Sequence, residues 1–250
     1  MRQSMMVLTL IGMVTMVFCL GADAKKAETV DVLLIAGDDV APYHDWREIS
    51  ETTREVLAGS DRFTVRVSED PLILESETAL KRYDAIVLTM FHRGEPKVTD
   101  QAKENLLNFV KGGKGFYVQH LASASFGDWE EFGKLCGRKW VMGTSGHGPR
   151  SVFECNVVNK KHPITKGLED FKIFDELYAK LQGDYDIDVL VSADSDWSEG
   201  TEPLVFTTTY GKGRCVHNAL GHDFKAILNP SMQKLIRRGV EWAATGKVAE

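Results

Sequence analysis

Apolar runs of strand length recur through the first half of the chain. Residues 29–37, 84–90 and 115–120 are mostly apolar, and residues 62–68 alternate between apolar and polar positions. Unbroken apolar runs of this length are typical of strands that are buried on both faces, and alternation is typical of a half-exposed strand. We therefore expect four strands in this half.

Amphipathic stretches separate these runs. Apolar positions at helical spacing predict helices over residues 45–59, 77–83 and 99–113, and Asp45 stands where it can cap the first of them. Strands that alternate with helices predict a parallel sheet covered on both faces. Because such crossovers are right-handed, the carboxyl ends of the strands share one edge of the sheet.

The second half has strands with short connections. Strand-like patterns cover residues 151–158, 187–193, 203–210 and 214–220, and "YGKGR" predicts a tight turn between the last two. We expect these strands to extend the sheet in antiparallel fashion. A final helix is predicted over residues 229–246, with Asn229 as its cap and Pro230 in its first position.

The N-terminus has the pattern of a secretory signal peptide. Arg2 precedes an apolar run that ends at Leu20, and Ala22-Asp23-Ala24 follows as an A-x-A cleavage site. A transmembrane anchor is the alternative, but the run is shorter than the ~20 residues of a typical span. We expect cleavage after residue 24, a single domain over residues 25–250 in the periplasm or outside the cell, and no membrane attachment. Intact-mass measurement of the exported protein checks this, because retention of residues 1–24 would contradict it.

Charge and cysteine content narrow the function classes. The formal net charge is −6 and the sequence pI is about 5.7, with no basic cluster, so nucleic acid is not an expected partner. Cys136, Cys155 and Cys215 remain after the predicted cleavage. An odd number of cysteines excludes a fully paired framework and leaves one disulfide open. The sequence also leaves open whether the chain forms a homo-oligomer.

Histidines gather at the ends of predicted strands. His44, His92, His120 and His222 each follow a strand, and His147 lies in a glycine-rich loop. If the strands are parallel, the first four lie on one rim, which is where open α/β sheets bind ligands. Each one alone is more often a hydrogen-bonded loop residue, and it is their convergence that indicates function.

A cluster of imidazoles suits proton transfer or metal binding. The chain has no HExxH, CxxC or HxH motif, so a divalent metal is left open without a metal signature. His217 lies within a strand and His162 precedes Pro163, so we interpret both as structural.

Carboxylates accompany the histidines. Asp39 follows the first strand, and Asp175 and Glu176 stand between apolar residues in "FKIFDELYAK". One interpretation is a solvated turn. The other is a carboxylate that faces the cleft, where it orients a histidine or acts as a base.

Tryptophans are the remaining candidates. The indole rings of Trp46, Trp129 and Trp197 can pack on the apolar face of a sugar, although indoles are also ordinary core side chains. We assign Trp140 and Trp242 to packing.

Several longer motifs occur together and in order: "GDDVAPYHDW", "GKGFYVQHLAS", "DWEEFGKLCG", "HPITKGLEDFKIFDELY", "YGKGRCVHNALGHD" and "RRGVEWA". With them the chain resembles the trehalose-utilisation (ThuA-like) family from about Val30 to Ala244. The resemblance implies a flavodoxin-like fold, similar to class I glutamine amidotransferases. This fold is a three-layer α/β sandwich with a mostly parallel central sheet and, here, an antiparallel extension.

The resemblance also bears on the chemistry. Amidotransferases carry a nucleophilic cysteine on the turn where this chain has His120, so we expect no glutaminase activity. The implied substrate is a disaccharide or a 3-keto sugar, cleaved by hydrolysis or by elimination. The alternative is a carbohydrate-binding protein without catalysis, and neither class implies a firm cofactor.

We predict His120 and Glu176 as the acid–base pair. The expected substrate contacts are Asp39, His44, Trp46, His92, His147, Asp175 and His222. A strand-end side chain on the solvent side is tolerant of change, so His120→Ala is expected to cost at most ~0.5 kcal/mol of stability.

Overall fold

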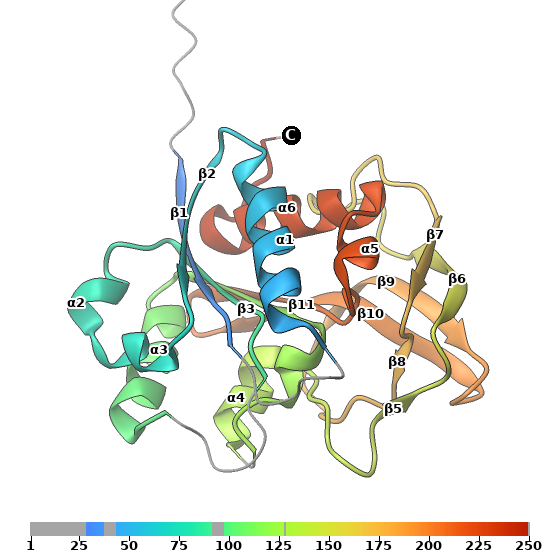
Figure 1. Ribbon diagram of the computed structural model, residues 1–250, viewed down its shortest axis with the longest axis horizontal. Coiled ribbons are helices and arrows are strands. Elements are labelled where there is room, and N and C mark those ends of the chain that lie inside the picture. The colour runs from blue at the N-terminus through green and yellow to red at the C-terminus, as the bar shows by residue number, and fades with distance from the viewer. Residues whose placement is uncertain (1–28, 38–43, 92–97, 128, 250) are drawn as a thin grey trace, which may run out of the picture.

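A nine-stranded mixed sheet forms the centre of the computed structural model, which describes residues 29–37, 44–91, 98–127 and 129–249 (Figure 1). The strand order is β2-β1-β3-β4-β11-β10-β9-β6-β7. The predicted signal peptide and the candidates Asp39 and His92 lie outside the described residues.

Five neighbouring strands form the parallel part of the sheet. They are β1 (Val30–Ile35), β2 (Phe63–Ser68), β3 (Ala85–Leu88), β4 (Gly115–Gln119) and β11 (Gly213–Asn218). The four strands predicted from the first half of the sequence are all confirmed. Their side chains are largely buried in β1, β3 and β4, as the unbroken apolar runs require.

The remaining strands of the large sheet form the antiparallel extension, of which the sequence predicted β10, β9 and β6 but not β7. They are β10 (Gly200–Tyr210), β9 (Asp188–Ser195), β6 (Ser151–Val157) and β7 (Phe171–Asp175). The strand β11 belongs to both parts. The Tyr210–Gly213 turn makes it antiparallel to β10, while its other edge pairs in parallel with β4. The sequence predicted this strand but assigned it to the extension alone.

A second, two-stranded sheet pairs β5 (Gly146–His147) with β8 (Tyr178–Ala179). In this pair His147 lies opposite Tyr178. The glycine-rich loop is therefore attached to the segment that follows β7.

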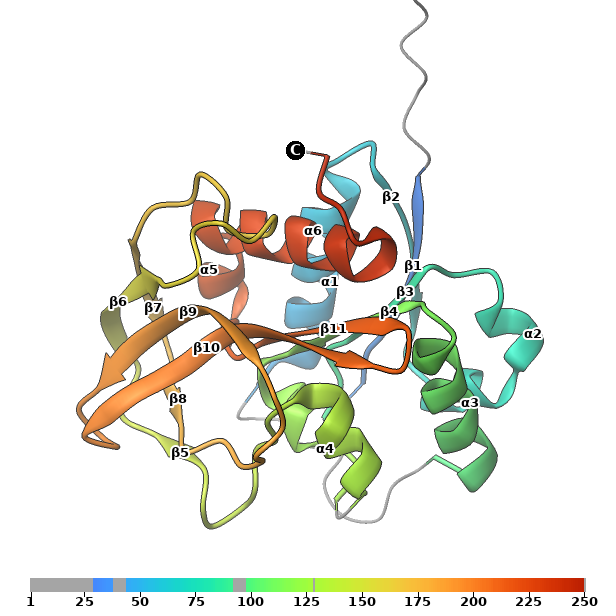
Figure 2. The same ribbon diagram turned by 180° about the vertical axis from the view of Figure 1, so that it is seen from behind.

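Helices cover both faces of the large sheet and make three layers. One face carries α1 (Trp46–Ala58), α5 (Phe224–Ile227) and α6 (Pro230–Thr245), which pack with Val32 and Leu34 of β1. The other face carries the 3₁₀ helix η1 (Pro71–Glu75), α2 (Glu77–Leu80), α3 (Asp100–Lys111) and α4 (Glu130–Cys136), which pack with Leu33 and Ile35. In Figure 2, α5 and α6 lie above strands β9–β11 and α4 lies below them. The three-layer fold is thus confirmed.

The predicted helix starts are also confirmed. The Asp45 carboxylate accepts a hydrogen bond from the Glu48 N–H, and the Asn229 side chain accepts one from the Ser231 N–H.

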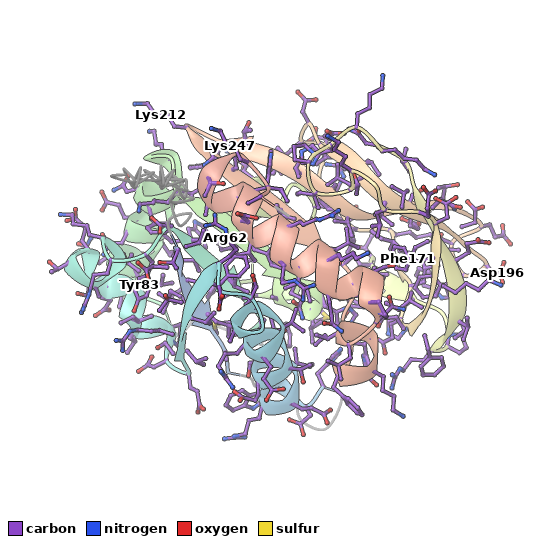
Figure 3. The ribbon with its side chains drawn as sticks, turned by 90° about the horizontal axis from the view of Figure 1, so that it is seen from above. Arg62, Tyr83, Phe171, Asp196, Lys212 and Lys247 are labelled. Atoms are coloured by element: carbon purple, nitrogen blue, oxygen red, sulfur yellow. The ribbon has the colours of Figure 1, made fainter. Side chains whose placement is uncertain are left out.

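The helix α6 runs lengthwise across the sheet with Arg62 beside it. The Arg62 guanidinium pairs with the buried Glu241 carboxylate at 2.6 Å (Figure 3). The helix lies so close to β4 that a Cβ on Gly115 would be 2.6 Å from the Ala243 carbonyl carbon.

None of the helices in the described part of the chain combines the length and the apolar character that crossing a bilayer requires.

Candidate functional site

Four strands deliver the candidate side chains to one edge of the sheet. The parallel strands β1, β4 and β11 end there, and His44, His120 and His222 follow them in the chain. Each step from β11 through β10, β9 and β6 to β7 reverses direction, so β7 runs the same way as β11. Glu176, which follows β7, therefore starts from the same edge.

A shared strand direction alone would leave Glu176 far from the three histidines. Strands lie about 4.8 Å apart, so four steps across a flat sheet span about 19 Å. Glu176 nevertheless lies close to the histidines because the sheet bends. Figure 1 shows β6 and β7 turned across β9 and β10. The bend brings the end of β7 against the loop that follows β11.

Asp175 fastens this contact. Its Oδ2 accepts a hydrogen bond from the Gly221 N–H at 2.7 Å, and its Oδ1 accepts from the N–H groups of His222 at 3.1 Å and Glu176 at 2.9 Å. The side chain is fully buried. Burial raises the pKa of the Asp175 carboxyl, and the nearby His120 and the three N–H groups oppose that rise. In the structure Asp175 positions the backbone of His222 and Glu176. Its predicted contact with substrate stays a prediction.

The side chains of His44, His120, His222 and Glu176 converge, and we call this group the His–Glu centre. Glu176 Oε2 lies 3.1 Å from His222 Nδ1, 3.5 Å from His120 Nε2 and 3.9 Å from His44 Nε2. The three imidazole centroids are 4.5 to 5.7 Å apart. The sequence predicted that these residues share a rim, and the structure places them in contact.

His120 occupies a strained turn. Its φ is +50°, in the left-handed region that side-chain-bearing residues rarely adopt, at the point where β4 gives way to the 3₁₀ helix η2 (His120–Ala124). Backbone strain of this kind is concentrated at functional sites. The ring stacks on Tyr178 at 4.0 Å, and its Nδ1 lies 2.7 Å from the Ala219 carbonyl oxygen.

The expected tolerance of His120→Ala is therefore wrong in its premise. The His120 side chain is only 3% exposed, and its backbone needs a positive φ. An alanine would lose the hydrogen bond and the stacking, and it would keep the strain.

Electrostatics in the centre follow from its burial. Burial, together with the neighbouring His120 and His222, lowers the pKa of His44 to about 3. Burial alone would raise the pKa of Glu176, but the surrounding imidazoles, His120 and His222 above all, hold it below its ordinary value. The centre thus contains the Glu176 carboxylate and the His44 imidazole, and this imidazole favours its neutral form.

His147 lies at the mouth of the centre. Its Nε2 is 3.6 Å from Glu176 Oε2, while its side chain is 35% exposed. Its Nδ1 lies 2.7 Å from the Gly148 carbonyl oxygen. His147 is therefore the imidazole of the site that solvent and a ligand can reach most easily.

An aromatic groove lies next to this mouth. Its volume is about 440 Å³, and Trp129, Trp140 and Tyr185 are among its lining residues. The Trp140 ring is 4.4 Å from that of Tyr178 and 6.0 Å from that of His147, so a lining residue of the groove also packs near the centre. Such a volume is typical of small-molecule sites.

The other tryptophan candidates lie apart from the centre. Trp46 packs against the core with the Arg47 guanidinium 4.1 Å from its ring centroid. Trp197 lines a separate cavity of about 330 Å³ that also includes Gly148 and Leu177. The predicted role of Trp46 in substrate binding stays a prediction.

Sequence reasoning missed Tyr178 and Trp140. Tyr178 is fully buried between His120 and Trp140, and Trp140 was assigned to packing. A signal for Tyr178 was available, because it stands two positions after the candidate Glu176 in the same apolar stretch. Trp140 carried no comparable pattern.

The residues interpreted as structural, and the three thiols, lie elsewhere. His217 is buried with its Nδ1 3.1 Å from the Cys136 carbonyl oxygen, and the His162 ring packs edge-on against Trp242. Cys136, Cys155 and Cys215 are free, and burial raises the pKa of each thiol. The described part of the chain therefore offers no activated thiolate, which needs exposure and a lowered pKa.

The donor set of the centre suits a cation. One ligand atom from each of the four side chains can be chosen so that all lie within 4.8 Å of one another. Imidazole nitrogen and carboxylate oxygen are common ligands of zinc and other transition metals.

Comparison with known proteins agrees with this fold. The family model described as "ThuA: Trehalose utilisation" matches residues 31–243. A ThuA-like protein from Parabacteroides merdae shares 28% identity at a TM-score of 0.77, over 89% of this chain and 92% of that one. A ThuA-like protein from Bacteroides uniformis shares 18% identity at a TM-score of 0.71, over 91% and 97%.

A larger enzyme contains the same fold. The β-galactosidase from Rahnella sp. R3 matches with 15% identity and a TM-score of 0.58, over 87% of this chain but 32% of that one. The comparison with curated proteins found no significant match.

Proposed function

Because the chain belongs to the ThuA, trehalose utilisation, family, we propose that it cleaves the glycosidic bond of a disaccharide or of its 3-keto derivative at the His–Glu centre. The observation that carries the proposal is the position of Glu176 Oε2, which has three imidazole nitrogens of the centre within 3.9 Å. A binding site for sugar hydroxyls does not need this concentration of ionisable groups.

Both routes of cleavage need groups that move protons. Hydrolysis needs an acid at the departing oxygen and a base for water. Elimination from a keto sugar needs a base at the carbon beside the ketone and an electrophile at the carbonyl oxygen. His120 and Glu176 are our candidates for these roles, and His147 stands at the mouth, where a substrate would enter.

The aromatic groove supports a sugar as the substrate. Pyranose rings present apolar C–H faces that pack on indole and phenol rings. Trp129, Trp140 and Tyr185 line the groove beside the centre. A sugar held there would have its second ring or its leaving group near His147.

We place this activity outside the cytoplasm. The support is the signal-peptide pattern of residues 1–24, and the intact mass of the exported protein is the check already described.

The proposal is tested with trehalose, other disaccharides and their 3-keto derivatives. Each is incubated with the purified protein, cleavage products are separated by chromatography and identified by mass, and binding is measured in parallel by calorimetry. We expect cleavage of at least one of these sugars. Binding without cleavage would replace the proposal with the sugar-binding alternative, and neither binding nor cleavage would overturn the carbohydrate assignment.

A further inference from the structure

We propose that His44, His120, His222 and Glu176 bind one divalent first-row transition-metal ion. The inference deepens the proposed function and rests on it only for placing the reaction at this centre. The metal site itself stands on the geometry and hydrogen bonding of the four side chains.

The four ligand atoms are close enough to share one ion. They lie within 4.8 Å of one another. Metal–nitrogen bonds of about 2.0–2.1 Å put two ligand atoms no more than about 4.2 Å apart. Rotations of the four side chains would have to close the remaining gap when an ion binds.

Hydrogen bonding decides where the lone pairs point. A carbonyl oxygen only accepts, so the contact of 2.7 Å with Ala219 places a proton on His120 Nδ1. In the neutral ring the lone pair is then on Nε2, which faces Glu176 Oε2 at 3.5 Å. His147 repeats the pattern, because its Nδ1 donates to Gly148 and its Nε2 faces the same oxygen.

The centre therefore gathers acceptors without enough donors. His120 Nε2 and Glu176 Oε2 are buried and have no hydrogen-bond partner, on side chains that are 3% and 9% exposed. His222 Nδ1 and His44 Nε2 face each other at 3.0 Å, where one proton at most can lie between them. Buried acceptors left unpaired are costly, and a single cation satisfies all of these lone pairs together.

The surroundings have the form of a supporting shell. Ligating histidines usually donate their second nitrogen to a carbonyl or a carboxylate, as His120 does to Ala219. Asp175 holds the backbone N–H groups of both Glu176 and His222, and the Tyr178 ring stacks on His120. Three of the four ligands are thus held in place independently of the ion.

The donor chemistry selects the class of metal. Three imidazoles and one carboxylate suit zinc, iron, nickel or copper, whereas magnesium and calcium prefer sites made of oxygen alone. His147 is outside the four-residue set. With an ion bound, His120 and Glu176 act as its ligands instead of as the acid–base pair, and His147 is the imidazole that remains to transfer a proton.

The test measures metal binding without any sugar. The untagged protein is purified without metal-affinity resin, stripped with a chelator and titrated with Zn²⁺ and with Co²⁺. Zinc is counted by mass spectrometry after dialysis, and Co²⁺ is followed by its visible absorption, which reports its ligands. The variants are Glu176→Gln and His120→Asn, and the control is His162→Gln, which alters a histidine that packs on Trp242 instead.

We expect one Zn²⁺ per chain and a Co²⁺ spectrum of an imidazole–carboxylate site. The affinity for the metal ion is expected to be at least about 100-fold weaker in both variants and unchanged in the control. Failure to bind one equivalent of either ion, or equal affinity in all variants, would overturn the inference. If a variant does not fold, the Co²⁺ spectrum of the unaltered protein decides, because a featureless spectrum means that the ion is not in this site.

The two proposals can fail separately. Metal binding without cleavage of any tested sugar would retain the metal site and overturn the proposed function. Sugar cleavage by a protein that binds neither Zn²⁺ nor Co²⁺ would do the reverse.

Discussion

Glu176→Gln is expected to lower the kcat/KM of sugar cleavage by about 100-fold or more while the protein stays folded. Glutamine has nearly the same shape as glutamate but carries no charge, so it can neither act as a base nor serve as an anionic metal ligand. Glu176 Oε2 is the atom around which the three imidazoles of the centre are arranged, at 3.1 to 3.9 Å. Steady-state kinetics on the sugar identified in the screen measure the loss.

The matched control is Glu154→Gln. Glu154 is an exposed residue of β6, in the same antiparallel extension that carries β7. Its replacement removes one negative charge from the molecule without touching the centre. If Glu176→Gln were as active as this control, Glu176 would have no part in the reaction.

His120→Asn is expected to lower kcat by about 100-fold or more. Asparagine is chosen over alanine because it tolerates the positive φ of this turn, which leaves the imidazole as the main change. The substitution also removes the ring that faces Glu176 at 3.5 Å and that stacks on Tyr178. The separate measurement of kcat and KM is the decisive readout.

Stability must be measured beside the kinetics. The Ala219 carbonyl loses its imidazole partner, so the free energy of unfolding is expected to fall by about 1–3 kcal/mol in denaturant titration. His162→Asn serves as the control for loss of an imidazole elsewhere. A raised KM with an unchanged kcat would assign His120 to binding alone and contradict the catalytic role.

Sequence patterns predicted most of the fold because they report local physics. Unbroken apolar runs in the sequence indicate that β1, β3 and β4 are buried on both faces. The starts of α1 and α6 can be predicted because Asp45 and Asn229 cap their own helices within a few residues. The two-residue strands β5 and β8 have no such pattern, because two residues are too few to show alternation of apolar and polar positions.

The candidate site was predictable in composition but not in geometry. Parallel strands share an edge, so His44, His120 and His222 could be expected together from topology. Asp175 and Glu176 could equally have formed a solvated turn. That alternative fails because Asp175 is fully buried against the N–H groups of Gly221 and His222.

By itself, the sequence determined the order of most strands and of the long helices, the three layers and the types of side chain that reach the rim, because each of these depends on neighbours in the chain. Only the tertiary structure decided that β7 bends back so that Glu176 meets His222 at 3.1 Å, and that Tyr178 backs His120. The physical reason is that a sheet's curvature depends on contacts between segments far apart in sequence. Here these are the bonds from the loop after β11 to Asp175, 46 residues away, and no local pattern encodes them.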